Sequence, residues 1–217
     1  MNWINLLDGT SAAIVIGGTL AATVLRCGLS DCGMTLRQLG QLRHPRFNAD
    51  ATQRELAQQV QDIQKDGLLR APTHHYADRE FDEATEALLE RRSIGALVER
   101  HEAHKARRGL ASERAVRTLA QGAELAPVFG LAGTLISLSQ LPADGIAKGA
   151  FSGAISMAVL TTLYGLLLAN LLLAPLARVV ERKAQAEEAE RQRLIDWLAG
   201  QLGSAIKPRA AFEREAA

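Results

Sequence analysis

From Gly149 to Ala177 the chain contains no Asp, Glu, Lys, Arg or His. A helix that crosses the hydrocarbon core of a membrane needs about 20 apolar residues. At 1.5 Å per residue this run would be about 43 Å long, against a core of about 30 Å. We therefore expect a transmembrane helix over residues 150–177 that overshoots the bilayer.

The residues of this helix are sorted by size around its circumference. Successive helical residues are separated by about 100°, which places small side chains on one narrow stripe: Ala154, Ala158, Thr161, Gly165 and Ala169. Large leucines occupy much of the rest. Small residues allow close contact between membrane helices, so we expect this helix to pack against neighbouring helices. A lone lipid anchor would need no such sorting.

Two other segments are apolar enough to cross a membrane. We expect a first transmembrane helix within residues 1–25 and a second over residues 119–141. The second carries a seam of small residues that includes Gly130 and Gly133. The connection at residues 142–149 is too short for a domain. The predicted fold class is an all-α polytopic membrane protein with three transmembrane helices and a cytoplasmic helical lobe.

The lobe is predicted over residues 26–118, where charged residues recur every few positions. Helical periodicity indicates helices over residues 51–66, 78–92 and 94–118. We expect the charged turns of these helices to be solvated faces with ion pairs inside each helix. We also expect solvated histidines: His74, His75, His101 and His104. Residues 178–217 are predicted to form a helical extension and a tail.

The basic residues predict an orientation. Of the 25 Lys and Arg residues, 16 lie between Arg26 and Arg117 and eight follow Ala177. Because Lys and Arg concentrate in cytoplasmic loops, the lobe and the C-terminus are predicted to be cytoplasmic. The N-terminus and the turn at residues 142–149 are predicted to lie outside.

The predicted spans contain hydroxyl groups but no ionisable side chain at mid-membrane depth, so the chain by itself is not expected to be a pump. It could form the wall of an ion pathway whose charge comes from another subunit. Thr134, Thr161 and Thr162 would supply hydroxyl oxygens to such a pathway. The alternative is that these hydroxyls bond to carbonyls of their own helices. Pro127 and Pro175 could act as coupling hinges or as static kinks.

Other classes of function find little support in the residues. Cys27 and Cys32 have no second ligand pair at zinc spacing, and no nucleophile, base or metal cluster converges, so we expect neither an enzyme nor a metal site or cofactor. Only 4% of residues are aromatic and no basic patch is interleaved with them. We therefore expect no nucleic-acid partner.

Two membrane motifs resemble those of the MotA/TolQ/ExbB proton-channel family, and most closely its flagellar stator branch: LAPVFGLAGTLISL at residues 125–138 and AISMAVLTTLYGLLLANLLLAPLA at residues 154–177. The resemblance implies a bacterial inner-membrane subunit that forms a ring of five around a dimeric partner. That single-span partner, of the MotB, TolR or ExbD kind, would carry an intramembrane Asp that binds a proton or a sodium ion.

The resemblance also implies roles for individual residues. Thr134, Thr161 and Thr162 match hydroxyls around the partner's Asp, and Pro127 and Pro175 match two prolines associated with coupling. Helix packing would rest on small residues: Gly130, Gly133, Ala158 and Gly165. Lys65 and Arg70 would be possible contacts to a flagellar rotor. A TolQ/ExbB-type envelope energiser and a non-conducting membrane scaffold are the alternatives to a stator.

Overall fold

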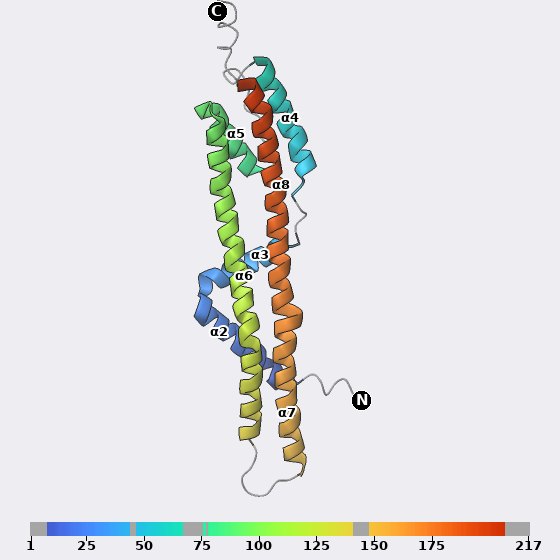
Figure 1. The fold of residues 1–217 in the computed structure, drawn as a ribbon. Coiled ribbons are helices and arrows are strands. Elements are labelled where there is room, and N and C mark those ends of the chain that lie inside the picture. The colour runs from blue at the N-terminus through green and yellow to red at the C-terminus, as the bar shows by residue number, and fades with distance from the viewer. Residues whose placement is uncertain (1–7, 44–46, 67–75, 77, 141–147, 207–217) are drawn as a thin grey trace, which may run out of the picture. The chain divides into compact units, whose positions relative to one another are not determined.

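The computed structural model describes residues 8–43, 47–66, 76, 78–140 and 148–206, with backbone only at 148–150 and 204–206. All regular structure in these ranges is helical, which confirms the predicted all-α fold class (Figure 1). The chain divides into two compact units. Unit 1 comprises Met1–His44 and Ala111–Lys183, and unit 2 comprises Pro45–Leu110 and Ala184–Ala217.

Within the described residues, three helical stretches are long and apolar enough to cross a membrane: Gly9–Cys27, Ile94–Ser139 and Phe151–Gly203. The second is a single helix, α6 (Ile94–Ser139), which unites the predicted helix at 94–118 with most of the predicted span at 119–141. The third is also continuous, through α7 (Lys148–Leu167), the π-helical segment η3 (Leu168–Leu173) and α8 (Ala174–Ile206). The turn predicted at 142–149 falls largely outside the described residues.

Unit 1 begins with one nearly continuous helical segment: α1 (Gly9–Ala12), the π-helical η2 (Ala13–Gly17) and α2 (Gly18–Cys27). The Asp8 carboxylate caps its start by accepting the backbone N–H groups of Thr10 and Ser11. The segment ends at Gly28, whose φ of 86° suits glycine because it has no Cβ. The shorter helix α3 (Leu29–Gln41) follows.

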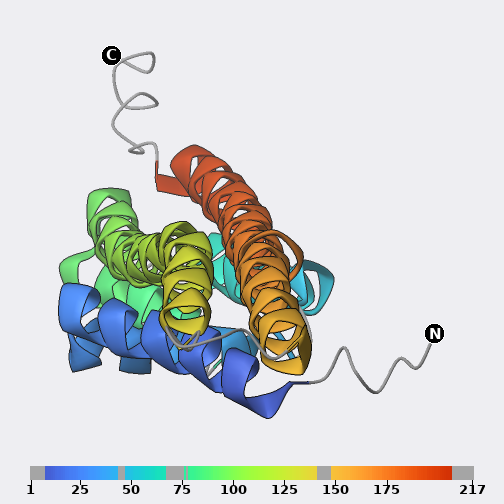
Figure 2. The same cartoon turned by 90° about the horizontal axis from the view of Figure 1, so that it is seen from below.

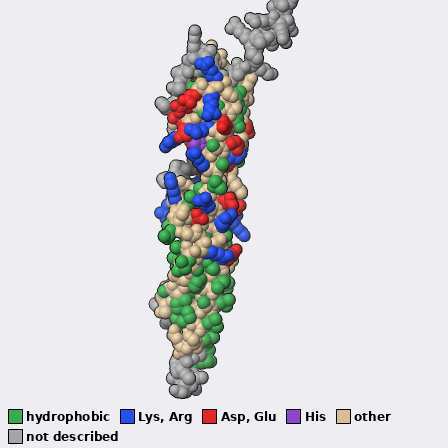
Figure 3. All heavy atoms as spheres, turned by 90° about the vertical axis from the view of Figure 1, so that its left-hand side faces the viewer, with side chains coloured by type: hydrophobic (Ala, Val, Ile, Leu, Met, Phe, Trp, Pro, Cys, Tyr) green, Lys and Arg blue, Asp and Glu red, His purple; other side chains and the backbone are tan. Residues whose placement is uncertain are grey.

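The α1–α2 segment crosses α6 and α7 on one side (Figures 1 and 2). The Phe129 ring occupies the space beside Gly18, where a Cβ would collide with it. Further along, Cys27 Sγ donates to Gln121 Oε1 at 2.9 Å. Within unit 1, Figure 3 shows hydrophobic side chains gathered away from the charged ones. Leu131 and Leu135 are 58% and 69% exposed, as suits side chains that face lipid.

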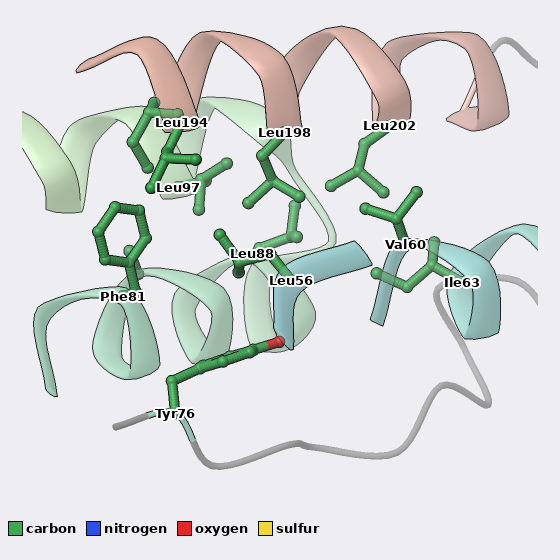
Figure 4. Packing of buried hydrophobic residues seen from close by; sticks show 12 residues of the cluster. Leu56, Val60, Ile63, Tyr76, Phe81, Leu88, Leu97, Leu194, Leu198 and Leu202 are labelled. Atoms are coloured by element: carbon green, nitrogen blue, oxygen red, sulfur yellow. The ribbon is translucent and has the colours of Figure 1, made fainter. Parts of the chain in front are cut away.

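Unit 2 has a leucine-rich core like that of a soluble protein (Figure 4). It contains α4 (Ala49–Asp66), α5 (Arg79–Arg91), residues 94–110 of α6 and residues 184–206 of α8. Helices were predicted at 51–66 and 78–92, and both are confirmed with small shifts. Asp78 caps α5 by accepting the N–H of Glu80, and Arg92 ends it in the left-handed conformation with φ 53°. Four fully buried leucines from three different helices form the centre: Leu56, Leu97, Leu198 and Leu202.

Candidate functional site

The backbones of α6 and α7 approach each other closely at glycine positions. A Cβ on Gly165 would lie 2.6 Å from the carbonyl oxygen of Ala126, and one on Gly130 would lie 3.0 Å from that of Thr161. The neighbouring atoms at both positions are backbone, which cannot rotate away. Glycine is therefore what permits this contact, and van der Waals packing of this kind is the main attraction between helices in lipid.

An open groove of about 490 Å³ runs beside this contact, between α6 and α7. Thr134 of α6 and Thr162 of α7 supply its side-chain hydroxyls. Its other lining residues are apolar: Leu138, Ile155, Ala158, Val159, Leu163 and Leu166. No residue in this lining is ionisable. The groove is therefore a hydrophobic cleft with two hydroxyl groups in its lining.

The three threonines predicted to form one pathway occupy two different environments. Thr134 and Thr162 line the groove, whereas Thr161 is fully buried and faces Gly133, where a Cβ would lie 2.8 Å from Thr161 Cβ. All three hydroxyls donate to carbonyls of their own helices. Thr134 Oγ1 lies 2.6 Å from Leu131 O, and Thr161 and Thr162 lie 2.9 and 3.3 Å from Ala158 O. Each oxygen keeps lone pairs that can still accept.

Both predicted hinge prolines lie within long helices. Pro127 is inside α6 beside the α7 contact, because a Cβ on Gly165 would come within 3.2 Å of Pro127 Cα. Pro175 is the second residue of α8, and Ala174 alone separates it from the π-helical segment η3. Proline has no N–H to give to the preceding turn, and π segments accommodate such interruptions.

The two predicted rotor-contact residues belong to unit 2. Lys65 is exposed in the last turn of α4. Arg70 lies outside the described residues. Among the residues that the structure does describe, no cluster of three or more His, Cys, Asp or Glu is arranged to hold a metal ion.

A second groove, which the sequence analysis did not identify, lies between the N-terminal segment and α7. The Asp8 backbone N–H donates to Tyr164 Oη at 3.1 Å, and both residues line this groove. Its walls include Ile16 from one π segment and Leu168 and Leu172 from the other. An acid directly before one span and a tyrosine inside another were the only signals in the sequence, and spacing cannot bring them together.

The sequence and the fold both match known proteins. A model of the MotA/TolQ/ExbB proton channel family matches residues 59–193. The chain is 38% identical over 74 residues to Motility protein A of Borreliella burgdorferi, which covers 34% of this chain and 28% of that protein. It is also 25% identical over 201 residues to the chemotaxis protein PomA of Vibrio alginolyticus, which covers 88% of this chain and 76% of PomA.

Among solved structures, the flagellar MotAB stator complex from Bacillus subtilis contains a chain that superposes with a TM-score of 0.82. The superposition covers 93% of this chain and 81% of that chain at 18% identity. At this level of identity the likeness is one of fold. The chain spans less than a third of the length of the Borreliella relative that it matches, so the activity of such a relative does not pass to it directly.

Proposed function

We propose, for a chain that belongs to the MotA/TolQ/ExbB proton channel family, that it forms the wall of an ion pathway and couples ion flow to mechanical work. The partner would be a MotB-like single-span subunit with an intramembrane Asp. Five copies of the chain would form a ring around a dimer of this partner. The complex would be a flagellar stator in the bacterial inner membrane.

The observation that carries this proposal is the groove between α6 and α7. Thr134 and Thr162 give it two hydroxyl oxygens in an apolar lining without ionisable groups. A polar pair in such a lining can help to solvate a cation but cannot bind one alone. A helix that brings a carboxylate with its bound proton or cation into the groove would complete the site, because the hydroxyl oxygens could then accept from that proton or coordinate that cation.

The structure suggests separate tasks for the threonines within this mechanism. Thr134 and Thr162 would accompany the ion beside the partner's Asp. Thr161, buried against Gly133, would set the distance between α6 and α7. Protonation of the Asp would change how the partner helix packs in the groove, and Pro127 and Pro175 are the points where α6 and α8 could bend.

The remaining features of the proposal concern orientation and the rotor. The excess of Lys and Arg in the lobe supports a periplasmic N-terminus and a cytoplasmic C-terminus. Lys65 and Arg70 would then be available to a rotor protein on the cytoplasmic side. The transported ion would be a proton or sodium, since hydroxyl oxygens accept either one.

Flux measurements on the complete complex test this proposal. The chain would be co-expressed with the single-span protein encoded beside it, reconstituted in liposomes, and assayed for proton and sodium uptake. We expect Thr134→Val and Thr162→Val to reduce uptake strongly, because valine keeps the shape and removes the oxygen. Thr162→Ser should conduct. Thr23→Val is the matched control, since Thr23 is buried in α2 and bonds Thr19 O away from the groove.

Wild-type uptake by both groove variants would contradict the pathway. A neighbouring protein without a membrane carboxylate would favour the non-conducting scaffold. A neighbour that carries a short periplasmic domain would favour the TolQ/ExbB-type energiser, whereas a peptidoglycan-binding end would favour the stator.

A further inference from the structure

Unit 2 contains two buried histidines on α6. The sequence analysis predicted His101 and His104 to be solvated, and this prediction is wrong, because they are 5% and 7% exposed. Both precede Glu124, after which the uncharged part of α6 begins, so they lie outside the membrane-crossing stretch. Their Nε2 atoms are buried without a hydrogen-bond partner. Such atoms are costly to bury unless the surrounding charges suit them.

His101 faces α8. Its Nε2 lies 3.7 Å from Glu188 Oε1, which is also buried without a hydrogen bond. The other oxygen of Glu188 accepts from Arg108 Nε and NH2 at 3.1 and 2.7 Å. One turn from His101, Lys105 Nζ donates to Gln192 Oε1 of α8 at 3.0 Å. The α8 carboxylate beside His101 is therefore already neutralised by arginine, and a second cation lies nearby.

His104 faces α5 and has a different environment. Its Nε2 lies 3.2 Å from Glu83 Oε2, and its Nδ1 lies 4.0 Å from Glu80 Oε1. Arg79 and Arg100 also pair with Glu83. His104 thus has two carboxylates within reach, whereas His101 has one.

We call the charged groups between α5, α6 and α8 the ion-pair cluster. Its carboxylates are Asp78, Glu80, Glu83, Glu187 and Glu188, and its guanidinium groups are Arg79, Arg100, Arg108 and Arg191. Glu102 and Lys105 pair with each other on the exposed side of α6. Glu188, the carboxylate beside His101, is held by Arg108 and is thereby neutralised, so a proton on His101 would add a charge that this pair does not compensate.

Burial has the same consequence for His101. Loss of solvation lowers the pKa of His101 below its ordinary value of 6.5, and Lys105 adds to this; together they outweigh the attraction of Glu188 and Glu102 and a hydrogen bond with Gln192, which raise it. If α6 separates from α8, the imidazole regains water and its ordinary pKa. The open form therefore binds a proton more tightly than the closed form, and acid favours opening.

We propose that His101 is a proton-sensing residue, whose protonation below neutral pH separates α6 from α8 within unit 2. Opening breaks the two links that flank it, Arg108 to Glu188 and Lys105 to Gln192. The neutral imidazole of His101 is compatible with the closed contact between α6 and α8. The protonated imidazole is stable only when this contact opens and water enters. It acts inside unit 2 and does not rest on the ion pathway proposed above.

Hydrogen exchange tests this inference in the full chain reconstituted in nanodiscs. Protection of residues 94–110 and 184–203 would be measured at pH 7.5, 6.5 and 5.5 and corrected for intrinsic exchange rates. We expect protection to fall below pH 6.5 by up to about tenfold per pH unit, the limit for one proton, until the pH reaches the pKa of the closed form. His101→Gln should remove this loss. His104→Gln should retain it.

An NMR titration of ¹⁵N-histidine in the wild-type chain provides a second readout that does not depend on a variant folding. The resonance assigned to His101 should titrate below pH 6.5. A pKa at or above 6.5 would overturn the proposal, as would equal loss of protection in His101→Gln and wild type. Ion uptake assays are independent of both results, so failure here leaves the pathway proposal intact.

Discussion

The helix α6 forms two contacts of different kinds. In unit 1 it meets α7 at Gly130, with backbone against backbone and threonine hydroxyls bonded inside their own helices. In unit 2 it contributes Leu97 to a leucine core and its charged side chains to the ion-pair cluster. Helices gain no hydrophobic free energy when they leave lipid for one another, so close van der Waals packing supplies the attraction in the membrane. In water, burial of apolar area supplies the attraction.

The exposure of leucine shows the same difference. Leu56, Leu97 and Leu202 of unit 2 are fully buried, whereas Leu131 and Leu135 of α6 lie mostly on the surface of unit 1. A leucine in unit 2 is therefore part of the attraction between helices, while most leucines in the membrane stretch face outward. We therefore expect truncation of a leucine to destabilise unit 2 more than unit 1. Enlargement of a glycine should destabilise unit 1 more than unit 2.

The largest effect is expected from Leu198→Ala in unit 2. Leu198 is 1% exposed in the leucine core, and loss of a buried leucine costs about 2–5 kcal/mol of unfolding free energy. Fluorescence of Trp197, in a Trp3→Phe background, would follow denaturant unfolding. Leu110→Ala, at a leucine that is 55% exposed, is the control and should change little. Equal losses of unfolding free energy in the two variants would contradict the inference that the leucine core stabilises unit 2.

A smaller but clear loss is expected from Gly165→Ala in unit 1. The added Cβ would meet the Ala126 carbonyl at 2.6 Å, and overpacking of this kind costs about 1–3 kcal/mol. Thermal unfolding in nanodiscs, followed by circular dichroism, would measure it. Gly153→Ala adds the same methyl group to α7 where no atom lies within 4 Å, so it should be neutral or slightly stabilising.

Asp78→Ala should have an intermediate effect on unit 2. Asp78 accepts the Glu80 N–H at 3.0 Å and pairs with Arg191 NH2 at 2.7 Å. Loss of the cap and of one partner of the largely buried Arg191 should cost about 1–2 kcal/mol. Asp78→Asn should restore the cap but not the charge, so a value between wild type and alanine in denaturant unfolding would separate the two contributions.

The smallest effect is expected from Arg117→Ala. Arg117 pairs with Glu113 one turn earlier at 3.0 Å, and both side chains are more than 60% exposed. Such pairs contribute about 0.3–0.5 kcal/mol and weaken with salt. Thermal unfolding at low and high salt should differ little between variant and wild type. A loss above 1 kcal/mol would mean that this exposed pair in unit 1 stabilises the fold about as much as the Asp78 contacts stabilise unit 2.

The sequence predicted the parts of the fold that depend on local pattern. The uncharged run from Gly149 to Ala177 by itself indicates a membrane span. The helices predicted to begin at residues 78 and 94 begin at Arg79 and Ile94, and the side chains of Asp78 and Ser93 accept N–H groups of Glu80 and Gly95 at these starts. Glycines at helical spacing indicated a close contact. They could not indicate its partner, because Gly165 meets Ala126 across more than 35 intervening residues, and periodicity carries no long-range information.

The geometry of the predicted site was harder to predict from the sequence, because it also depends on packing between helices. Thr161 and Thr162 are adjacent and differ by about 100° around the helix, so only the position of α6 decides which one lines the groove. The prediction for the histidines was wrong for a different reason. The charged helix was expected to be solvated, but α5 and α8 pack over His101 and His104, and the local sequence does not predict contacts with helices distant in the chain.

The hydrogen bonds of Thr134 and Thr162 have one further consequence. A hydroxyl carries a single hydrogen, and each of these two directs it to a carbonyl of its own helix. On the groove side only the oxygen lone pairs remain, so these two hydroxyls can accept hydrogen bonds but cannot donate them. Any occupant must therefore bring its own positive end, be it a protonated acid, a hydronium-like water or a bare cation, and a naked carboxylate would find no donor waiting for it.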